Sequence, residues 1–212
     1  MSPPATALVF VVDDDASVRK SLARLLKAAG YEAETFASVR DFLARRPHDG
    51  PCCLVLDVRM PGLTGLELQE ALAGKGHRTP IVFITGHGDI PMSVKAMKDG
   101  AVDFLTKPFD VENLLEAVQR ALTKDSKDLS EEGRTAEVLE RVKLLTPRET
   151  EVCALVVTGM LNKQIARELG IGEKTIKVHR ARVMEKMQAG SVAELVRLAD
   201  RAGVVVPQAQ VQ

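Results

Sequence analysis

Residues 8–22, LVFVVDDDASVRKSL, decide how the amino-terminal part of this chain is interpreted. An apolar run of five residues ends in three adjacent acids, Asp13, Asp14 and Asp15, and a helical pattern begins directly after them. A short apolar run bounded in this way is typical of a buried strand followed by a helix. Adjacent carboxylates repel one another, so we expect a compensating cation close to these side chains.

The composition is that of a globular protein with one large or two modest domains. The chain has 212 residues, of which 45% are hydrophobic and 27% charged, and its formal net charge is zero. No apolar run approaches the roughly 20 residues that span a bilayer, and the opening MSPPATALVF lacks the basic region of a secretion signal. Three cysteines without metal-ligand spacing fit a reducing compartment. We therefore expect a cytoplasmic protein without membrane association.

Apolar runs alternate with helical patterns through the first 122 residues, which indicates a parallel sheet covered by helices on both faces. This is an α/β arrangement, a doubly wound five-stranded parallel sheet. The strands are expected near 7–12, 32–36, 52–56, 81–84 and 102–105, and the helices near 16–29, 39–45, 64–73, 90–99 and 111–122.

The remainder of the chain is predicted to be entirely helical. Residues 123–143 are rich in Lys, Asp, Ser and Glu and form a linker, either a solvated spacer or an amphipathic helix in its second half. Short helices are then expected near 147–158, 163–169, 173–187 and 192–202. The predicted organisation is a first domain over 1–122, a linker over 123–143 and a second domain over 144–212.

Polar residues follow the strands at the edge where a doubly wound sheet binds its ligands. Asp13 and Asp14 come after the first strand, Asp57 after the third, Thr85 after the fourth and Lys107 after the fifth. With the strand order 2-1-3-4-5 the acids meet in one crevice, where a hard cation such as Mg²⁺ would offset their repulsion. A carboxylate can form an aspartyl phosphate, so Asp57 is the predicted nucleophile and Lys107 the contact to the phosphoryl group.

Each of these residues also has a simpler interpretation. Asp15 is best explained as the N-cap of the following helix. Taken alone, Asp57 and Thr85 fit turn positions and Lys107 fits a solvated loop. Their coincidence at one edge of the sheet favours the phosphoryl-transfer site.

The segments VVDDD, LVLDVRMPGLTGLEL and IVFITGHGDIPMSVKAMKDGAVDFLTKPF resemble the receiver domain of two-component response regulators, most closely the FixJ type. The resemblance covers nearly all of residues 8–122 and implies the flavodoxin-like, CheY-like fold. It implies Mg²⁺ bound by Asp14, Asp57 and the backbone carbonyl of Arg59, with Asp13 assisting through water. It also implies phosphorylation of Asp57 by a sensor histidine kinase.

The same resemblance implies a switch. Thr85 is paired in this family with an aromatic residue of the fifth strand that turns inward after phosphorylation, and Phe104 occupies that position. A plain core aromatic explains Phe104 equally well. The Lys107–Pro108 bond resembles the family's cis peptide, a form seen at only about 5% of X–Pro bonds in general.

Residues 145–187, LTPRETEVCALVVTGMLNKQIARELGIGEKTIKVHRARVMEKM, contain two short amphipathic helices joined by a glycine-rich turn, as in a helix-turn-helix. A helical wheel with Ile176 inward also turns Val183 and Met187 inward and leaves His179 and Arg180 at the boundary. The outward face mixes cations with small apolar groups, which suits phosphates and base edges in a major groove. Its predicted DNA-binding residues are Lys174, Lys177, Val178, Ala181 and Arg182, with Glu185 on the same face.

The segments LTPRE, NKQIA and TIKVH resemble the NarL/LuxR type of DNA-binding domain over residues 145–202. The resemblance implies that Lys177 and Val178 enter the groove, and Arg180 is expected to pair with Glu149 or Glu168. The last helix is either a dimer seam or packed on its own domain. Its candidate seam residues are Val192, Leu195, Val196 and Ala199.

Together the resemblances imply a phosphorylation-controlled transcription regulator that dimerises through its fourth helix, fifth strand and fifth helix. The implied partners are the kinase, double-stranded promoter DNA, RNA polymerase and a second copy of the chain. The protein is not expected to be an enzyme beyond its own phosphotransfer and dephosphorylation. Two rivals are a free-standing phosphohydrolase and a DNA-binding protein whose receiver acts without phosphorylation.

Overall fold

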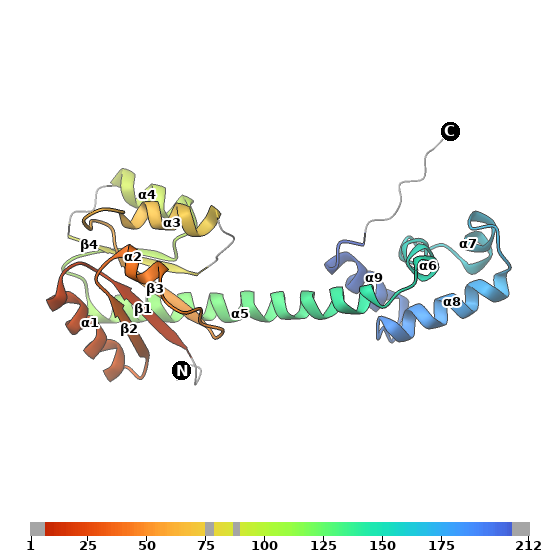
Figure 1. Ribbon diagram of the computed structural model, residues 1–212, viewed down its shortest axis with the longest axis horizontal. Coiled ribbons are helices and arrows are strands. Elements are labelled where there is room, and N and C mark those ends of the chain that lie inside the picture. Colours follow the sequence, from red (N-terminus) through yellow and green to blue (C-terminus); the bar gives the residue numbers. More distant parts are fainter. Residues whose placement is uncertain (1–6, 75–78, 87–89, 205–212) are drawn as a thin grey trace. The chain divides into compact units, whose positions relative to one another are not determined.

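The computed structural model describes residues 7–74, 79–86 and 90–204. The outer ends of the two predicted domains, residues 1–6 and 205–212, lie outside that description. The chain divides into two compact units, Met1–Leu129 and Ser130–Gln212, and each has its own apolar core (Figure 1).

The first unit contains a five-stranded, all-parallel sheet in the predicted order β2-β1-β3-β4-β5 (Figure 1). All six residues of the central strand β3 are buried, which explains why the first five, CCLVL, are all apolar. The strands are β1 (Leu8–Val12), β2 (Glu32–Phe36), β3 (Cys52–Asp57), β4 (Ile81–Thr85) and β5 (Asp103–Thr106).

Helices cover both faces of this sheet, as in a doubly wound fold (Figure 1). One core lies between the sheet and α1 and α5, and the other lies between the sheet and α2, α3 and α4. The adjacent Cys52 and Cys53 belong to these two different cores, because successive strand residues point to opposite faces. The helices are α1 (Ala16–Ala28), α2 (Val39–Leu43), α3 (Gly65–Gly74), α4 (Ile90–Lys98) and α5 (Val111–Lys143).

Most predicted boundaries agree with the structure to within one or two residues, the usual uncertainty of helix and strand ends. Gly30 and Gly100 follow α1 and α4 with φ of 87° and 94°, the left-handed conformation that glycine supplies where a helix ends. The Lys107–Pro108 peptide is cis.

The fifth helix is the main difference from the sequence prediction. The apolar pattern places its end at Leu122, whereas α5 continues to Lys143, so residues 123–143 are helical throughout. This segment contains no proline and only one glycine, Gly133, and its Lys, Glu, Leu and Arg residues favour helix without needing a buried face. The helix ends where Leu144 and Leu145 lead into the next cap at Thr146.

The second unit is helical. Its core gathers apolar residues from four short helices together with Val138 from the end of α5. The four helices are α6 (Pro147–Val157), α7 (Asn162–Glu168), α8 (Glu173–Lys186) and α9 (Val192–Arg201). A capping box begins α6, in which Thr146 and Glu149 satisfy each other's backbone N–H groups and Pro147 takes the first helical position.

Candidate functional site

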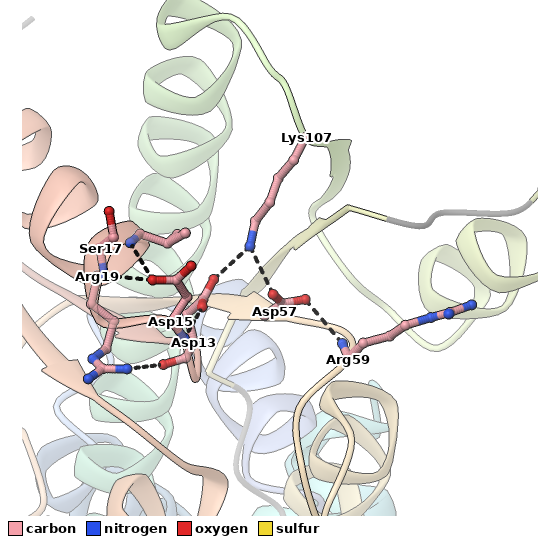
Figure 2. Close-up of polar contacts among 8 residues, drawn as sticks. Asp13, Asp15, Ser17, Arg19, Asp57, Arg59 and Lys107 are labelled. Atoms are coloured by element: carbon pink, nitrogen blue, oxygen red, sulfur yellow. Dashed lines mark hydrogen bonds and ion pairs between the residues drawn. The ribbon is translucent and has the colours of Figure 1, made fainter.

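The carboxyl-terminal edge of the sheet brings together charged side chains that are far apart in the sequence. Asp13 directly follows β1, Asp57 is the last residue of β3, and Lys107 follows β5. Nζ of Lys107 lies 2.7 Å from Oδ2 of Asp13 and 2.8 Å from Oδ2 of Asp57 (Figure 2). One ammonium group therefore bridges the two predicted acids.

Asp13 is the most buried acid of this cluster, with 0% of its surface exposed. Its Oδ1 accepts a hydrogen bond from the backbone N–H of Asp15 at 2.8 Å, and its Oδ2 accepts from Lys107, so both carboxylate oxygens have a donor. Burial raises the pKa of the Asp13 carboxyl above its usual value, although Lys107 opposes that rise. Burial also acts to lower the pKa of the Lys107 ammonium, but its hydrogen bonds to Asp13 and Asp57 outweigh burial and the pKa is raised. Lys107 is therefore positively charged at neutral pH.

Asp14 completes a group of three carboxylates. One oxygen each from Asp13, Asp14 and Asp57 lies within 4.8 Å of the others, and among the described residues this is the one cluster of acids, histidines or cysteines with metal-ligand geometry. Asp14 is exposed, whereas Asp13 and Asp57 are buried. Carboxylate oxygens in small number, open to solvent on one side, suit a hard divalent cation. This acidic pocket can therefore hold a divalent metal ion.

The turn after β3 fixes the orientation of Asp57. Oδ1 of Asp57 accepts a hydrogen bond from the N–H of Arg59 at 3.1 Å (Figure 2). A Cβ on Gly65, at the start of α3, would lie 2.6 Å from the carbonyl oxygen of Asp57, so only glycine lets this helix approach so closely. The role of the Arg59 carbonyl as a metal ligand stays a prediction.

Thr85 lies on β4, the strand next to that of Asp57, and Phe104 lies on β5, one strand further out. Thr85 ends β4, is fully buried, and its carbonyl accepts the N–H of Lys107 at 2.7 Å. Phe104 pairs in register with Phe83 of β4, and their ring centroids are 6.1 Å apart. Phe104 is half-buried, so it has access to both the core and the surface.

Asp15 caps the first helix, as predicted. Its Oδ1 accepts hydrogen bonds from the N–H groups of Ser17 and Val18 at 2.7 and 3.4 Å. A contact that the sequence analysis missed lies beside it, where Nη1 of Arg19 is 2.7 Å from the backbone carbonyl oxygen of Asp13 (Figure 2). No sequence motif signals such a bond, because it joins a flexible side chain to a backbone atom.

In the second unit, α8 has the two faces that the helical wheel predicted. Ile176, Val183 and Met187 are fully buried, and His179 and Arg180 are half-buried at the boundary. The opposite face is exposed over Lys174, Lys177, Val178, Ala181, Arg182 and Glu185.

The hydrogen-bond partner of Arg180 differs from the predicted one. Its Nη1 donates to Oδ1 of Asn162 at 2.9 Å, and not to Glu149 or Glu168. Glu149 is held instead by Lys186, whose Nζ lies 2.6 Å from its Oε2. Hydrogen bonds from Lys186 and from the Thr146 backbone lower the pKa of Glu149 to about 2. The prediction was wrong because α8 carries several cations along its length, and only the fold decides which of them meets Glu149.

The candidate dimer residues of α9 divide between core and surface. Leu195 and Ala199 are buried in their own unit, and Val192 packs against the same core. Val196 is 38% exposed. Of the four candidates, Val196 and part of Val192 are therefore accessible at the surface of this unit, and the dimer seam stays a prediction.

The fourth helix of the first unit carries an exposed apolar face. Ile90, Val94 and Met97 are 78%, 44% and 46% exposed and are spaced so that they share one side of α4. A neighbouring group of large exposed apolar residues marks an interaction surface more often than isolated ones do.

Comparison with known proteins identifies both units. Residues 9–119 match the response regulator receiver domain, and residues 143–199 match the luxR family of bacterial regulatory proteins. Nodulation protein W of Bradyrhizobium diazoefficiens is 49% identical over 198 residues, which cover 93% of this chain and 87% of the relative. The transcriptional regulatory protein FixJ of the same organism is 45% identical over 197 residues, covering 93% and 96%. The solved structure of the response regulator StyR matches with 48% identity and a TM-score of 0.83, covering 93% of this chain and 100% of that one.

Among the described residues, no helix combines the length and the apolar content needed to cross a membrane. The charged edge of the first unit and the exposed face of α8 in the second unit both lie within the residues that match a family. This chain belongs to the two-component response regulators that carry a LuxR-type DNA-binding domain, the group of transcription regulators that includes FixJ.

Proposed function

We propose that Asp57 accepts a phosphoryl group from a sensor histidine kinase, and that this modification controls the binding of promoter DNA by the second unit. The observation that carries the proposal is the bridging of Asp13 and Asp57 by Lys107, beside a cluster of three carboxylates. Such an arrangement combines a nucleophile, a cation for the transferred group and acids for a metal ion.

In the transfer, the N–P bond of a kinase phosphohistidine breaks and an O–P bond forms at the Asp57 carboxylate. The electron pair of the broken bond remains on the imidazole nitrogen. Lys107 stays protonated and exchanges its contact with Asp57 for one with the phosphoryl oxygens. Mg²⁺ held by Asp14, Asp57 and the Arg59 carbonyl, with Asp13 acting through water, would neutralise charge on those oxygens. We propose no enzymatic activity beyond this transfer and the later hydrolysis of the chain's own phosphoryl group.

The modification is proposed to act through Thr85 and Phe104. The buried Thr85 side chain shifts toward the new anion, and Phe104 turns inward into the space that it leaves. This biases the surface of α4, β5 and α5 toward association of two receiver units. The exposed Ile90, Val94 and Met97 supply apolar area for that association.

Dimerisation would bring two copies of α8 to two half-sites of a promoter. Its exposed Lys174, Lys177 and Arg182 can contact phosphates or guanine edges, and Val178 and Ala181 can contact thymine methyl groups. Linking the two copies raises the effective concentration of the second. Contact with RNA polymerase and activation of transcription complete the proposal, and a reporter gene under a bound promoter tests both.

Intact-mass spectrometry after treatment with acetyl phosphate and Mg²⁺ tests the first step. We expect one acid-labile phosphoryl adduct on the wild type and none on Asp57→Asn. Asp15→Asn is the matched control, because asparagine also caps a helix and the adduct should persist. Absence of an adduct on the wild type would contradict the proposal, and turnover of small phosphate esters would favour a phosphohydrolase.

Beryllofluoride tests the later steps without a kinase. We expect it to increase dimerisation and DNA affinity of the wild type and to leave Asp57→Asn unchanged, as measured by analytical ultracentrifugation and fluorescence anisotropy. A wild type that forms the adduct but shows no change in either quantity would support the rival in which the receiver acts without phosphorylation.

A further inference from the structure

Arg19 contacts the acidic loop, which is formed by Asp13, Asp14 and Asp15 after β1. The proposed chemistry does not use this contact. Arg19 lies four residues after the N-cap Asp15, and its side chain returns toward the start of α1, where Nη1 donates to the Asp13 carbonyl oxygen at 2.7 Å (Figure 2). Long helical side chains commonly point toward the helix amino terminus, so the conformation is unstrained. The hydrogen bond ties the first helix to the end of the first strand.

The carbonyl that Arg19 holds belongs to the peptide bond between Asp13 and Asp14. Because a peptide unit is planar, holding its oxygen sets the plane and therefore the direction in which Asp14 leaves the strand. Asp13 does not need this help, since Lys107 and the Asp15 N–H already hold its carboxylate. Asp14 is exposed, and within the described residues its carboxylate takes part in no hydrogen bond. The backbone is therefore the part of Asp14 on which a contact can act.

We propose that Arg19 is a positioning residue for the cation site, which holds the Asp13–Asp14 peptide so that the Asp14 carboxylate faces the ion shared with Asp57. This role rests on the proposed metal-dependent phosphorylation and adds a residue to it. Groups that orient metal ligands typically change metal affinity about 10- to 100-fold when they are removed. The guanidinium also adds a positive charge on the side of the Asp13 backbone carbonyl. The experiment must therefore separate the loss of that charge from the loss of orientation.

The chain offers a matched control in Lys20. It is the next residue of α1, carries the same charge, is exposed, and forms no hydrogen bond or ion pair with the part of the chain that the structure describes. Isothermal titration of Mg²⁺ into the full-length protein should give a dissociation constant about tenfold weaker for Arg19→Gln and within about twofold of wild type for Lys20→Gln. Arg19→Lys keeps the charge but loses the guanidinium geometry, so it should recover only part of the affinity.

Unfolding temperatures of all four proteins in EDTA report whether a substitution only destabilises the fold. A positioning role predicts that the affinity of Arg19→Gln falls even where its unfolding temperature stays close to that of Lys20→Gln. Equal Mg²⁺ affinities of Arg19→Gln and Lys20→Gln, or full recovery in Arg19→Lys, would overturn the inference while leaving the proposed function intact. A wild type that binds no Mg²⁺ would overturn the cation site itself, and this role of Arg19 with it.

Discussion

The charged sheet edge of the first unit, where Lys107 bridges Asp13 and Asp57, and the exposed face of α8 in the second unit are built in opposite ways. At the edge, the functional side chains come from three different strand ends and are held by one another, with Asp13 and Asp57 almost entirely buried. On α8, the functional residues come from a single helix, and their exposed cations make few contacts within the protein, such as the 3.7 Å pair of Lys177 with Glu173. The proposed phosphoryl transfer requires side chains that converge on one point, whereas the proposed DNA binding requires side chains that are exposed to solvent.

This difference predicts that substitutions at the edge affect both stability and chemistry, while substitutions on the α8 face affect DNA binding alone. Lys107→Met should have the largest effect. It leaves the buried Asp13 carboxylate without its cation, and breaking such a pair lowers the free energy of unfolding by about 3 kcal/mol. Amide hydrogen exchange of β1 and β3 in the full-length protein measures the loss.

The pH dependence of that loss follows from the raised pKa of Asp13. A carboxyl group whose pKa is higher in the folded than in the unfolded state opposes folding when it is ionised, so the deficit of Lys107→Met should shrink as the pH falls and Asp13 takes up a proton. The double variant Asp13→Asn/Lys107→Met should recover most of the stability at neutral pH. A deficit of equal size in the double variant would show that Lys107 stabilises the fold in another way.

Gly65→Ala should have the next largest effect. Its new Cβ would lie 2.6 Å from the Asp57 carbonyl oxygen, so α3 or the end of β3 must shift, at a cost of about 1 to 3 kcal/mol. Slower phosphorylation by acetyl phosphate should accompany the loss of stability. Gly74→Ala is the control, because a Cβ there meets no atom within 4 Å, and it should be neutral or slightly stabilising. Equal behaviour of the two variants would contradict the close packing of α3 on β3.

The Glu149–Lys186 pair predicts an acid sensitivity of the second unit. The pKa of Glu149 is lowered to about 2 in the folded state, against an unfolded value of roughly 4.3. The ionised Glu149 therefore contributes to the free energy of unfolding above the unfolded pKa, and this contribution is lost as the pH falls toward 2. Protection of the α6 and α8 amides should therefore decline through this range. Glu149→Gln should flatten the decline, and an unchanged profile in that variant would exclude Glu149 as its cause.

Lys177→Ala should have the smallest effect, confined to DNA binding. Loss of one phosphate contact weakens binding to a random-sequence duplex by about 1 kcal/mol and lowers the slope of log affinity against log salt by about 1. Hydrogen exchange of α8 should not change, because Lys177 is exposed. Glu185→Ala, on the same face but acidic, should not weaken binding. A loss of α8 protection in Lys177→Ala would break the distinction between edge and face.

The sequence was most informative where the local pattern of apolar residues indicates which side chains are buried. The apolar runs predicted the five strands, and the helical wheel predicted the buried Ile176, Val183 and Met187, whereas the confirmed strand order came from the resemblance to receiver domains. Both succeed because alternation along a strand and the turn of a helix are local properties. The extent of α5 was not predictable in this way, since residues 123–143 form a helix without a continuous apolar face.

Pairings between distant residues were predicted less well. The meeting of Asp13, Asp57 and Lys107 followed from topology, because all parallel strands end at one edge. The partner of Arg180 did not, since Asn162, Glu149 and Glu168 were all compatible with its position on α8. The burial of Leu195 and Ala199 within their own unit likewise depended on which side of α9 faces the core.

The order of residues along the chain thus determined the class of the fold, the acids at its strand ends and the outward face of α8, because each depends on local periodicity or on a general rule of sheet connection. The tertiary structure alone decided that one ammonium bridges two acids, that Arg19 holds the Asp13 carbonyl and that Lys186 neutralises Glu149. Long cationic side chains reach several acceptors within their radius, and only the packing of the surrounding elements selects one of them.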